Sequence, residues 1–537
     1  MTIKVRHRIK YLLLSYLILF SSLYSNAGSY HSGLLGSDSG LVLLDLSAHP
    51  DDEDGAALAY YSLLKGVKCY SIFYTRGEGG QNEIGSQLDE ELGKIREQET
   101  KDAAKIQHSI PLFLGFLDFG YSKTARETFA KWGGEDSILA RVVLMIRKIR
   151  PDVIITNHDT ITIKPNRQHG NHQAVGITAY DAFGKAADPS YHPEQLINGV
   201  TVWQVKKLFF RDFDTVSVNS DSVVTIDVSK MNGDSRTIEQ ISVDALAKHR
   251  TQGMDKININ SFPALFRERR YELIRSDKQY PFSNSDLFSG LTSSFHPELH
   301  PESIATAYSY KTITSDDSIR TLKEVKWKPG INIGLVTTYD STIKNTLNAF
   351  GMNYGILDSN SLRSSDLSQY STIVLDIRTY FYRPDAESYG SRLLNYIQNG
   401  GNIVCFYNKP GDWNYRKTSP YPIFISPERV TEEDAKVNVL VPGHPFFNTP
   451  NKIGDKDWDG WVQERSIYLP ADDTAFTSSI YERLLSMHDT DEIQPPTSLL
   501  WAHYGEGTYT YCSLALYRQL RIFHEGALKL FMNMISR

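Results

Sequence analysis

The chain has 537 residues and a net charge of −6, and 41% of its residues are hydrophobic. This length predicts two or three domains, and the composition supports a packed core, which excludes wholesale disorder and collagen-like repeats. Dedicated nucleic-acid binders usually have a basic surface, so the acidic balance argues against nucleic acid as a partner. Three cysteines, Cys69, Cys405 and Cys512, are too few for a disulfide framework, and the sequence has no Cys-x-x-Cys pair.

The first 27 residues have the pattern of a secretory signal peptide. Basic residues between positions 4 and 10 precede an uncharged, mostly apolar run over 11–24, and residues 25–27 are a small-residue cleavage site. A helix needs about 20 apolar residues to span a bilayer, and no later stretch of the sequence is long and apolar enough. We therefore expect an exported protein, periplasmic or extracellular, with no transmembrane segment after cleavage. An uncleaved N-terminal anchor is the alternative.

The next part of the sequence alternates strand-like and helix-like segments. Short apolar runs predict the strands, and longer amphipathic stretches predict the helices. The predicted strands are 41–48, 67–74, 111–116 and 153–156, and the predicted helices are 53–65, 88–106 and 137–149. Buried strands separated by helices indicate βαβ units and a parallel sheet that is covered on both faces.

The pattern is less regular from 185 to 317, and a second alternation follows it. Two strands (202–210 and 222–228) and one helix (237–252) are expected as peripheral additions to the first domain. The second alternation has predicted strands at 331–337, 371–375 and 402–407 and predicted helices at 341–350, 386–398 and 526–535. The predicted organisation is a first α/β domain over 28–317, a polar linker over 318–330 and a second α/β domain over 331–537.

The first motif that can carry chemistry is His49-Pro50-Asp51-Asp52-Glu53, between the first predicted strand and the first predicted helix. Ligands of open parallel sheets bind beyond the carboxyl ends of the strands, where this motif lies. His49 and Asp52 can both reach one metal ion from a tight turn, and zinc accepts imidazole and carboxylate together. Asp51 could then remain off the metal and act as a base. The alternative is that Asp51 or Asp52 only caps the following helix.

The second motif is a histidine pair, His169 and His172, which follows the strand 153–156 and opens a helical stretch over 173–183. Such a pair is common by chance. Its position at the carboxyl end of a strand is the observation that favours a ligand-binding role. Residues at i and i+3 share a helix face. Together the two motifs would supply two histidines, an aspartate and an open fourth position, the three protein ligands plus water of a catalytic zinc site. We interpret His158, near the same strand end, as a solvated loop residue.

Several segments in this order resemble the PIG-L/LmbE-like zinc-dependent N-acetylglucosamine deacetylases. Residues 47–53 (SAHPDDE) resemble the AHPDDE signature of that family. The other similar segments are 75–82 (TRGEGGQN), 92–99 (LGKIREQE), 114–118 (LGFLD), 151–156 (PDVIIT), 169–172 (HGNH) and 246–252 (LAKHRTQ). The resemblance spans about 41–252 and implies a Rossmann-like parallel sheet for the first domain.

The resemblance implies hydrolysis of the N-acetyl group of an N-acetylglucosamine-type sugar or glycoconjugate, with Zn²⁺ as cofactor and acetate as product. The long loop 157–168 before the second motif departs from the family pattern. The resemblance therefore does not identify the residues that contact the substrate at the rim of the site, whereas the implied zinc ligands are unaffected. The site residues implied are His49, Asp52 and His172 as zinc ligands, Asp51 as general base, His169 as the group that polarises the amide carbonyl, and Arg96 and Asp118 as sugar contacts.

The second domain resembles, more loosely, a class I glutamine amidotransferase-like domain of flavodoxin-like α/β type, through segments 396–408 and 517–533. The nucleophilic cysteine of such enzymes lies on a glycine-flanked elbow, whereas Cys405 lies inside a predicted strand without flanking glycines. We therefore expect this domain to be degenerate and noncatalytic. Two alternatives to a deacetylase remain: a noncatalytic carbohydrate-binding or assembly protein of the same fold, and a glutamine amidotransferase that uses Cys405.

Overall fold

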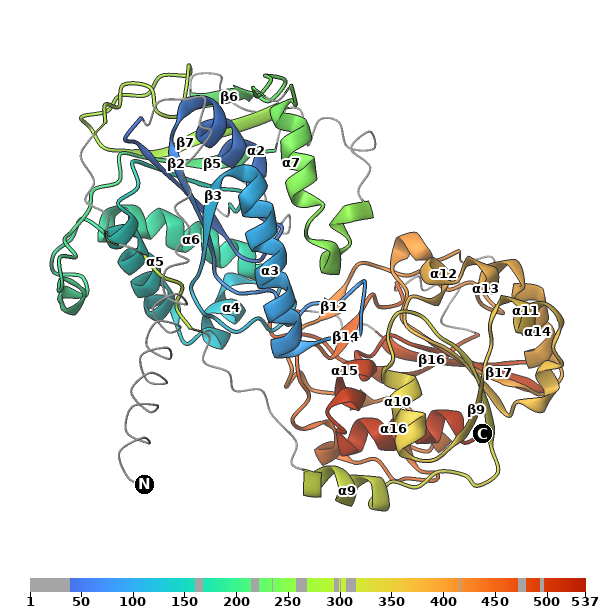
Figure 1. Ribbon diagram of the computed structural model, residues 1–537. Helices are drawn as coiled ribbons and strands as arrows, with labels where there is room; N and C mark the ends of the chain where they lie inside the picture. The colour runs from blue at the N-terminus through green and yellow to red at the C-terminus, as the bar shows by residue number, and fades with distance from the viewer. Residues whose placement is uncertain are drawn as a thin grey trace, which may run out of the picture.

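The computed structural model contains two α/β units, each built around its own sheet (Figure 1). It describes residues 39–537 except 160–167, 214–221, 234, 257–267, 294–298, 300, 306–314, 415–416, 472–479 and 493–496. The expected signal peptide over 1–27 and most of the expected rim loop over 157–168 lie outside the described residues. Among the helices that are described, none is long and apolar enough to cross a membrane.

The first unit has a seven-stranded sheet in the order β3-β2-β1-β4-β5-β7-β6. Strands β3 to β5 of this order run parallel, and β7 pairs antiparallel with both β5 and β6. All six residues of β1 are buried, as expected for a central strand covered on both faces. The strands are β1 (Val42–Ser47), β2 (Lys68–Phe73), β3 (Ser109–Phe113), β4 (Val153–Thr156), β5 (Lys207–Asp212), β6 (Val223–Asp227) and β7 (Glu268–Ser276).

Helices cover both faces of this sheet. Side chains of successive strand residues point to opposite faces, and Leu43 and Leu44 of β1 accordingly belong to two different hydrophobic clusters. The helices on the Leu43 side are α2 (Gly55–Ala59) with its π-helical continuation (Tyr60–Leu64), α3 (Asp89–Gln107) and α7 (Ile238–Leu246). Those on the Leu44 side are α4 (Ala125–Lys131), α5 (Glu135–Ile149) and α6 (Gly170–Lys185).

The region expected as a peripheral addition extends the main sheet. Strands β5 and β6 occupy two of its positions, and β7, which the sequence did not predict, lies between them. The sequence of β7, ERRYELIRS, is rich in charged residues and lacks the apolar run from which the other strands were predicted. Tyr271 is nevertheless fully buried, and its hydroxyl donates to Asp54 Oδ2 at 2.7 Å, so the strand is held partly by polar contacts that hydrophobic periodicity does not reveal.

The second unit has an eight-stranded mixed sheet in the order β13-β15-β16-β17-β11-β10-β8-β9. Its part from β17 to β9 is parallel, and β13, β15 and β16 are antiparallel additions. The strands are β8 (Asn332–Val336), β9 (Asn353–Ile356), β10 (Thr372–Leu375), β11 (Asn402–Phe406), β13 (Asn438–Val439), β15 (Glu482–Ser486), β16 (Thr497–Tyr504) and β17 (Gly507–Cys512). A separate ribbon pairs β12 (Arg429–Val430) with β14 (Ser466–Ile467).

Helices cover this second sheet on two faces as well. One face carries α10 (Thr342–Ala349), α15 (Leu516–Arg521) and α16 (Glu525–Ile535), and the other carries α11 (Ser359–Ser364), α13 (Pro384–Ser388) and α14 (Gly390–Gln398). A short helix, α12 (Thr379–Tyr382), follows β10, and α9 (Ser315–Glu324) occupies the first half of the segment expected as a linker. The structure therefore shows a mixed α/β architecture with two parallel-rich sheets.

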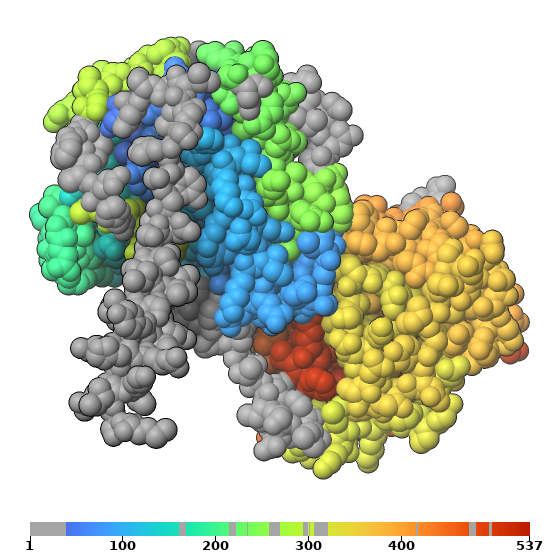
Figure 2. All heavy atoms as spheres, viewed as in Figure 1, coloured from blue at the N-terminus to red at the C-terminus, as the bar shows by residue number. Residues whose placement is uncertain are grey.

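The carboxyl edges of the two sheets face each other. The loop after β2 contacts the loop after β11, where Gln81 Nε2 donates to the Tyr407 hydroxyl at 2.8 Å. A salt bridge joins Lys123 to Asp489 at 2.8 Å elsewhere along the contact. Figure 2 shows the blue segment near residue 90 in contact with the red segment near residue 520. Because ligands bind at the carboxyl edges of parallel sheets, the space between the units is the expected site of any ligand.

Candidate functional site

The first motif forms a tight turn between β1 and α2. The Asp52 N–H donates to the His49 carbonyl at 3.2 Å, and Asp51 has a positive φ of 86°. Strained residues of this kind concentrate at functional sites. The side chain that caps α2 belongs to Asp54, which accepts a hydrogen bond from Ala57 N–H at 3.1 Å. The alternative that Asp51 or Asp52 serves only as a helix cap is therefore wrong.

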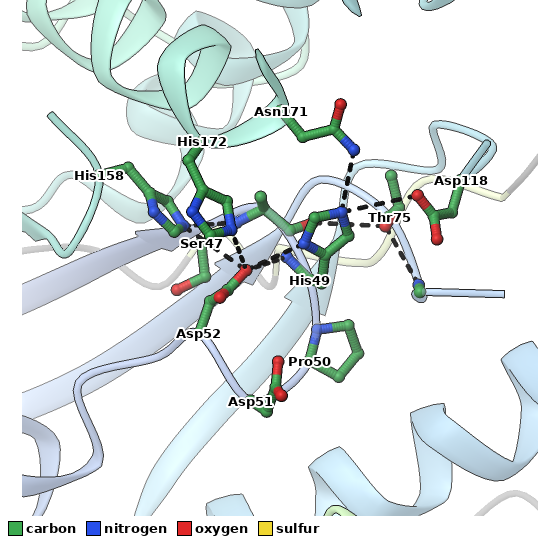
Figure 3. Close-up of polar contacts among 12 residues, drawn as sticks. Ser47, His49, Pro50, Asp51, Asp52, Thr75, Asp118, His158, Asn171 and His172 are labelled. Atoms are coloured by element: carbon green, nitrogen blue, oxygen red, sulfur yellow. Dashed lines mark hydrogen bonds and ion pairs between the residues drawn. The ribbon is translucent and has the colours of Figure 1, made fainter. Parts of the chain in front are cut away.

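Two of the three predicted metal ligands, His49 and His172, converge on a carboxylate oxygen of the third, Asp52 (Figure 3). Asp52 Oδ2 lies 3.0 Å from His49 Nδ1 and 3.2 Å from His172 Nε2. Adjacent ligand atoms of a tetrahedral zinc ion, with bonds of about 2.0–2.1 Å, are separated by about 3.3 Å. The two imidazoles and the carboxylate therefore have the chemistry of a zinc ligand set, which fits that cofactor, and both distances to Asp52 Oδ2 are close to the expected spacing. Among the described residues, two groups have ligand atoms that all lie within 4.8 Å of one another: His49 with His169 and His172, and Asp52 with His158 and His172.

His169 lies beside this group of ligands. It is the N-cap residue of α6, and its ring centroid lies 3.8 Å from that of His172 and 5.5 Å from that of His49. Its Nδ1 is buried and has no hydrogen-bond partner among the described residues. Because buried polar atoms are normally hydrogen-bonded, this nitrogen is available to a ligand of the site.

His158 also lies in the site, and our interpretation of it as a solvated loop histidine is wrong. Its side chain is 2% exposed, and its ring stacks on His172 with the centroids 4.1 Å apart. Its Nε2 accepts a hydrogen bond from Ala48 N–H at 3.0 Å, and burial lowers its pKa. Its Nε2 also lies 3.7 Å from Asp52 Oδ2, and His158 forms with Asp52 and His172 a group that could hold a metal ion. Because Nε2 already accepts the Ala48 N–H, we place His158 behind His172 and not among the predicted ligands. Its position just after β4, at the carboxyl edge, is the sequence signal that could have identified it.

The two adjacent aspartates differ in their electrostatic surroundings. Burial and the neighbouring charge of Asp52 raise the pKa of Asp51 to about 7. Burial acts on Asp52 as well, but His172 and His49 outweigh it and hold the pKa of Asp52 well below its usual range. Asp52 is therefore the carboxylate that stays ionised, whereas Asp51 can exchange a proton near neutrality.

The predicted sugar contacts, Arg96 and Asp118, line the same crevice and also hold the loop after β2. Arg96 donates to carbonyl groups of this loop, including that of Gln81 at 2.8 Å. Asp118 Oδ2 accepts from Gly79 N–H at 3.1 Å, and its Oδ1 lies 3.5 Å from His49 Nε2. Both side chains therefore shape the wall of the crevice, and their contact with a sugar remains a prediction.

The segment after α7 holds the turn of the first motif in place. His249 Nε2 lies 3.1 Å from Glu53 Oε1, and Gln252 Nε2 donates to the Pro50 carbonyl at 2.6 Å. Burial lowers the pKa of His249, but the Glu53 carboxylate outweighs this effect and raises it. These two contacts join the segments 47–53 and 246–252, which lie about 200 residues apart in the sequence.

The site opens into a cavity of about 400 Å³ between the two units. Tyr121 of the first unit also lines this cavity. The sequence predicted no site residue in the second unit, because these cavity residues lie on loops, on the β12–β14 ribbon and on α15 and form no local motif. The residues that the second unit contributes are Lys409, Arg429, Ile467, Tyr468 and Arg518.

A larger cavity of about 550 Å³ lies at the other end of the second sheet. It surrounds Gly400 and the amino ends of β10, β11 and β17. The groups that could hold a metal ion, as far as the structure is described, all lie in the first unit. We therefore assign the functional site to the smaller cavity, where the titratable side chains converge.

Both cysteines of the second unit are buried in strands. Cys405 in β11 and Cys512 at the end of β17 are inaccessible to solvent, and burial raises the pKa of each thiol to about 12. The thiolate is the nucleophilic form of cysteine, so neither residue is activated. Both cysteines are therefore core residues, which leaves the amidotransferase alternative without a nucleophile.

Comparison with known proteins points to the same region. Residues 44–183 match the PIG-L family, described as GlcNAc-PI de-N-acetylase. A 1D-myo-inositol 2-acetamido-2-deoxy-alpha-D-glucopyranoside deacetylase from Geodermatophilus obscurus is 29% identical over 185 residues, which is 31% of this chain and 60% of that protein. The deacetylase 2 of the same description from Saccharopolyspora erythraea is 31% identical over 184 residues, which is 30% of this chain and 62% of that protein.

The structure of N,N'-diacetylchitobiose deacetylase from Pyrococcus horikoshii is 16% identical, with a TM-score of 0.32, and the match covers 43% of this chain and 83% of that chain. The chain spans about three fifths of the length of the two deacetylases from Geodermatophilus obscurus and Saccharopolyspora erythraea. The family match confirms the resemblance over 44–183. This region contains all the predicted site residues, His49, Asp51, Asp52, Arg96, Asp118, His169 and His172.

Proposed function

We propose that the chain is a zinc-dependent carbohydrate N-deacetylase that hydrolyses the N-acetyl group of an N-acetylglucosamine-type sugar or glycoconjugate. The observation that carries the proposal is the convergence of two histidines on the Asp52 carboxylate, with Asp51 and His169 beside them. The match to the PIG-L family supports it, since residues 44–183 include all four of these side chains and His169.

His49, Asp52 and His172 would hold the zinc ion. An ion bound there would supply Lewis-acid chemistry, lowering the pKa of a water molecule to about 7 and polarising the acetamide carbonyl. The carboxylate charge of the site favours a cation: Asp118 and Asp52 outweigh burial and raise the pKa of His49 to about 10, so a metal ion would displace a proton from this imidazole.

Asp51 is proposed as the general base. It takes a proton from the attacking water as the water oxygen bonds to the carbonyl carbon, a contribution of about 10²–10⁴-fold. When the carbon–nitrogen bond breaks, the same carboxyl group returns the proton to the leaving nitrogen. The products are acetate and the free amine of the sugar.

His169 is proposed to stabilise the oxyanion. Burial and the neighbouring histidines lower its pKa, so the imidazole is neutral and carries one N–H donor. A donor directed at a developing oxyanion contributes about 3–4 kcal/mol to transition-state stabilisation.

We further propose that the protein is exported and that its second domain is a degenerate, amidotransferase-like module. The pattern of residues 1–27 and the buried Cys405 support these two proposals. Fractionation of expressing cells tests the first, with the protein expected outside the cytoplasm.

Release of acetate from a panel of N-acetylglucosamine conjugates by zinc-loaded protein tests the proposed activity. Equimolar acetate and free amine are expected. Saturable binding of the sugars without any acetate would instead favour the noncatalytic carbohydrate-binding alternative.

A further inference from the structure

The second unit forms one wall of the cavity, and this wall is cationic. Among its cavity-lining side chains, Lys409, Arg429 and Arg518 are basic and none is acidic, as far as the structure is described. The opposite wall carries the acidic residues Asp51 and Asp52 with their histidines. A ligand in the cavity therefore has the residues proposed to hydrolyse the acetamide on one side and fixed positive charge on the other.

The two arginines are held in place by one buried glutamate. Glu464 is fully buried, with Oε1 2.5 Å from Arg429 Nη1 and Oε2 2.8 Å from Arg518 Nη1. A single carboxylate balances only one of the two guanidinium charges, so the group keeps a net positive charge. The Lys409 ammonium adds to it, because it forms no ion pair with the part of the chain that the structure describes.

Aromatic rings fix Arg429 between the two units. Its guanidinium carbon lies 4.3 Å from the ring centroid of Tyr121 in the first unit and 4.7 Å from that of Tyr468 in the second. The Tyr121 ring in turn lies 5.3 Å from the His169 ring. The positive wall is therefore only one aromatic ring away from the proposed oxyanion donor, which is close enough for one small conjugate to touch both.

Both guanidinium groups keep donors for a ligand. A guanidinium has five N–H donors. Arg429 Nη2 donates to the Tyr468 hydroxyl at 2.8 Å, and Arg518 Nε donates to the Tyr517 hydroxyl at 2.9 Å. Arg518 Nη1 is buried and, although close to Glu464, has no hydrogen-bond partner among the described residues. Both arginines line the cavity, so their remaining N–H groups can donate to a ligand there, and carboxylate and phosphate oxygens match the guanidinium geometry.

We propose that Arg429, Arg518 and Lys409 form a subsite for an anionic group of the substrate, so that the second domain selects acidic conjugates of N-acetylglucosamine. This inference rests on the proposed deacetylase function. The shared chemistry is a carboxylate or a phosphate attached to the amino sugar. The domain thus acts in substrate specificity without any catalytic residue of its own.

The test compares three substrates with the full-length, zinc-loaded protein: neutral N,N'-diacetylchitobiose, N-acetylglucosamine joined to glucuronate, and N-acetylglucosamine 1-phosphate. An acidic substrate is expected to have the higher kcat/KM, and this preference should fall as ionic strength rises, because salt screens partly exposed charges. Preference for the glucuronate conjugate assigns a carboxylate to the subsite, and preference for the phosphate assigns a phosphate. The highest kcat/KM for the neutral disaccharide, independent of salt, would overturn the subsite.

Lys409→Gln is the decisive variant, because this partly exposed side chain holds no buried partner in place. It should raise KM for the preferred acidic substrate by about tenfold, equivalent to about 1.4 kcal/mol, and this increase should be several times larger than any change in KM for the neutral disaccharide. Arg518→Lys, which keeps the charge toward Glu464 but loses the planar fork, should also raise KM. Lys417→Gln, on the surface of the same unit, is the matched control and should change neither substrate. Equal effects of Lys409→Gln on all three substrates would contradict the proposal.

Binding measurements separate this inference from the proposed function. Calorimetry with the Asp51→Asn protein should show tighter binding of the acidic conjugate than of the neutral disaccharide. If the protein binds acidic conjugates selectively but releases no acetate from any substrate, the proposed function fails and the subsite stands. If it deacetylates all substrates without selectivity in binding, the subsite fails and the function stands.

Discussion

The carboxylates of Asp51 and Asp52 are adjacent in sequence but lie in different parts of the site. Asp52 Oδ2 contacts His49 and His172, whereas no hydrogen bond or ion pair joins the Asp51 side chain to the other residues drawn in Figure 3. The positive φ of Asp51 produces this separation, because it turns the chain between the two side chains. Two carboxylates whose pKa values are driven apart are the usual basis for separate chemical roles.

Single substitutions should separate these roles. Asp51→Asn should keep the bound metal and lower kcat by about 10²–10⁴-fold, because an amide cannot accept the proton of water. Asp52→Asn should instead weaken metal binding, because a neutral amide replaces a charged ligand. Metal content and steady-state kinetics of both variants check this, with the exposed Asp136→Asn as control. Identical behaviour of the two variants would show that the division of roles is wrong.

The metal content tests the ligand assignment directly. The purified protein should carry about one zinc-like ion per chain. The double variant His49→Ala, His172→Ala should carry none, because only one protein ligand remains. His192→Ala, which alters a partly exposed histidine outside the site, should keep the metal. Unchanged occupancy in the double variant, measured by elemental analysis, would refute the assignment.

His158 should support the metal without binding it. His158→Ala leaves Ala48 N–H unpaired and removes the ring stacked on His172, so it should lower the free energy of unfolding by about 1–3 kcal/mol. Loss of a residue that supports a ligand typically weakens metal affinity by about 10–100-fold. Titration against a chelator and thermal unfolding measure the two effects. A complete loss of metal would instead make His158 a ligand.

Most of the first sheet could be predicted from the sequence, because its strands are buried on both faces and are therefore apolar runs. β1 and β4 lie within one residue of the predicted bounds. β7 could not be predicted, since its buried face is stabilised by the contact of Tyr271 with Asp54 and not by hydrophobic periodicity. The helix predicted over 53–65 starts at Gly55, after the Asp54 cap.

The site was predictable where its residues form local motifs and not elsewhere. His49 and Asp52 form one local motif and His169 and His172 another, and the structure brings the two motifs together. His158 belongs to no such spacing, and Arg429 reaches the cavity only because the second unit packs against the first. Tertiary packing of this kind leaves no trace in a single sequence.

Cys405 should be dispensable for the proposed activity. Cys405→Ala should leave deacetylation intact and change the free energy of unfolding by about 1–3 kcal/mol, as for a modest truncation in a core. Cys512→Ala is the matched control, because it truncates another fully buried thiol in the neighbouring strand. Acetate release, glutaminase activity and chemical denaturation are measured for both variants. Glutaminase activity in the parent protein that Cys405→Ala alone abolishes would revive the amidotransferase alternative.

The most direct measurement follows acetate and free amine together when the full-length, zinc-loaded protein acts on N-acetylglucosamine conjugates. Our account predicts the two products in equal amounts, loss of both after chelation, recovery on adding zinc, and nearly complete loss in Asp51→Asn with its metal still bound. Full activity of Asp51→Asn, or of the metal-free protein, would contradict the account. So would the absence of acetate from every conjugate when the metal is in place.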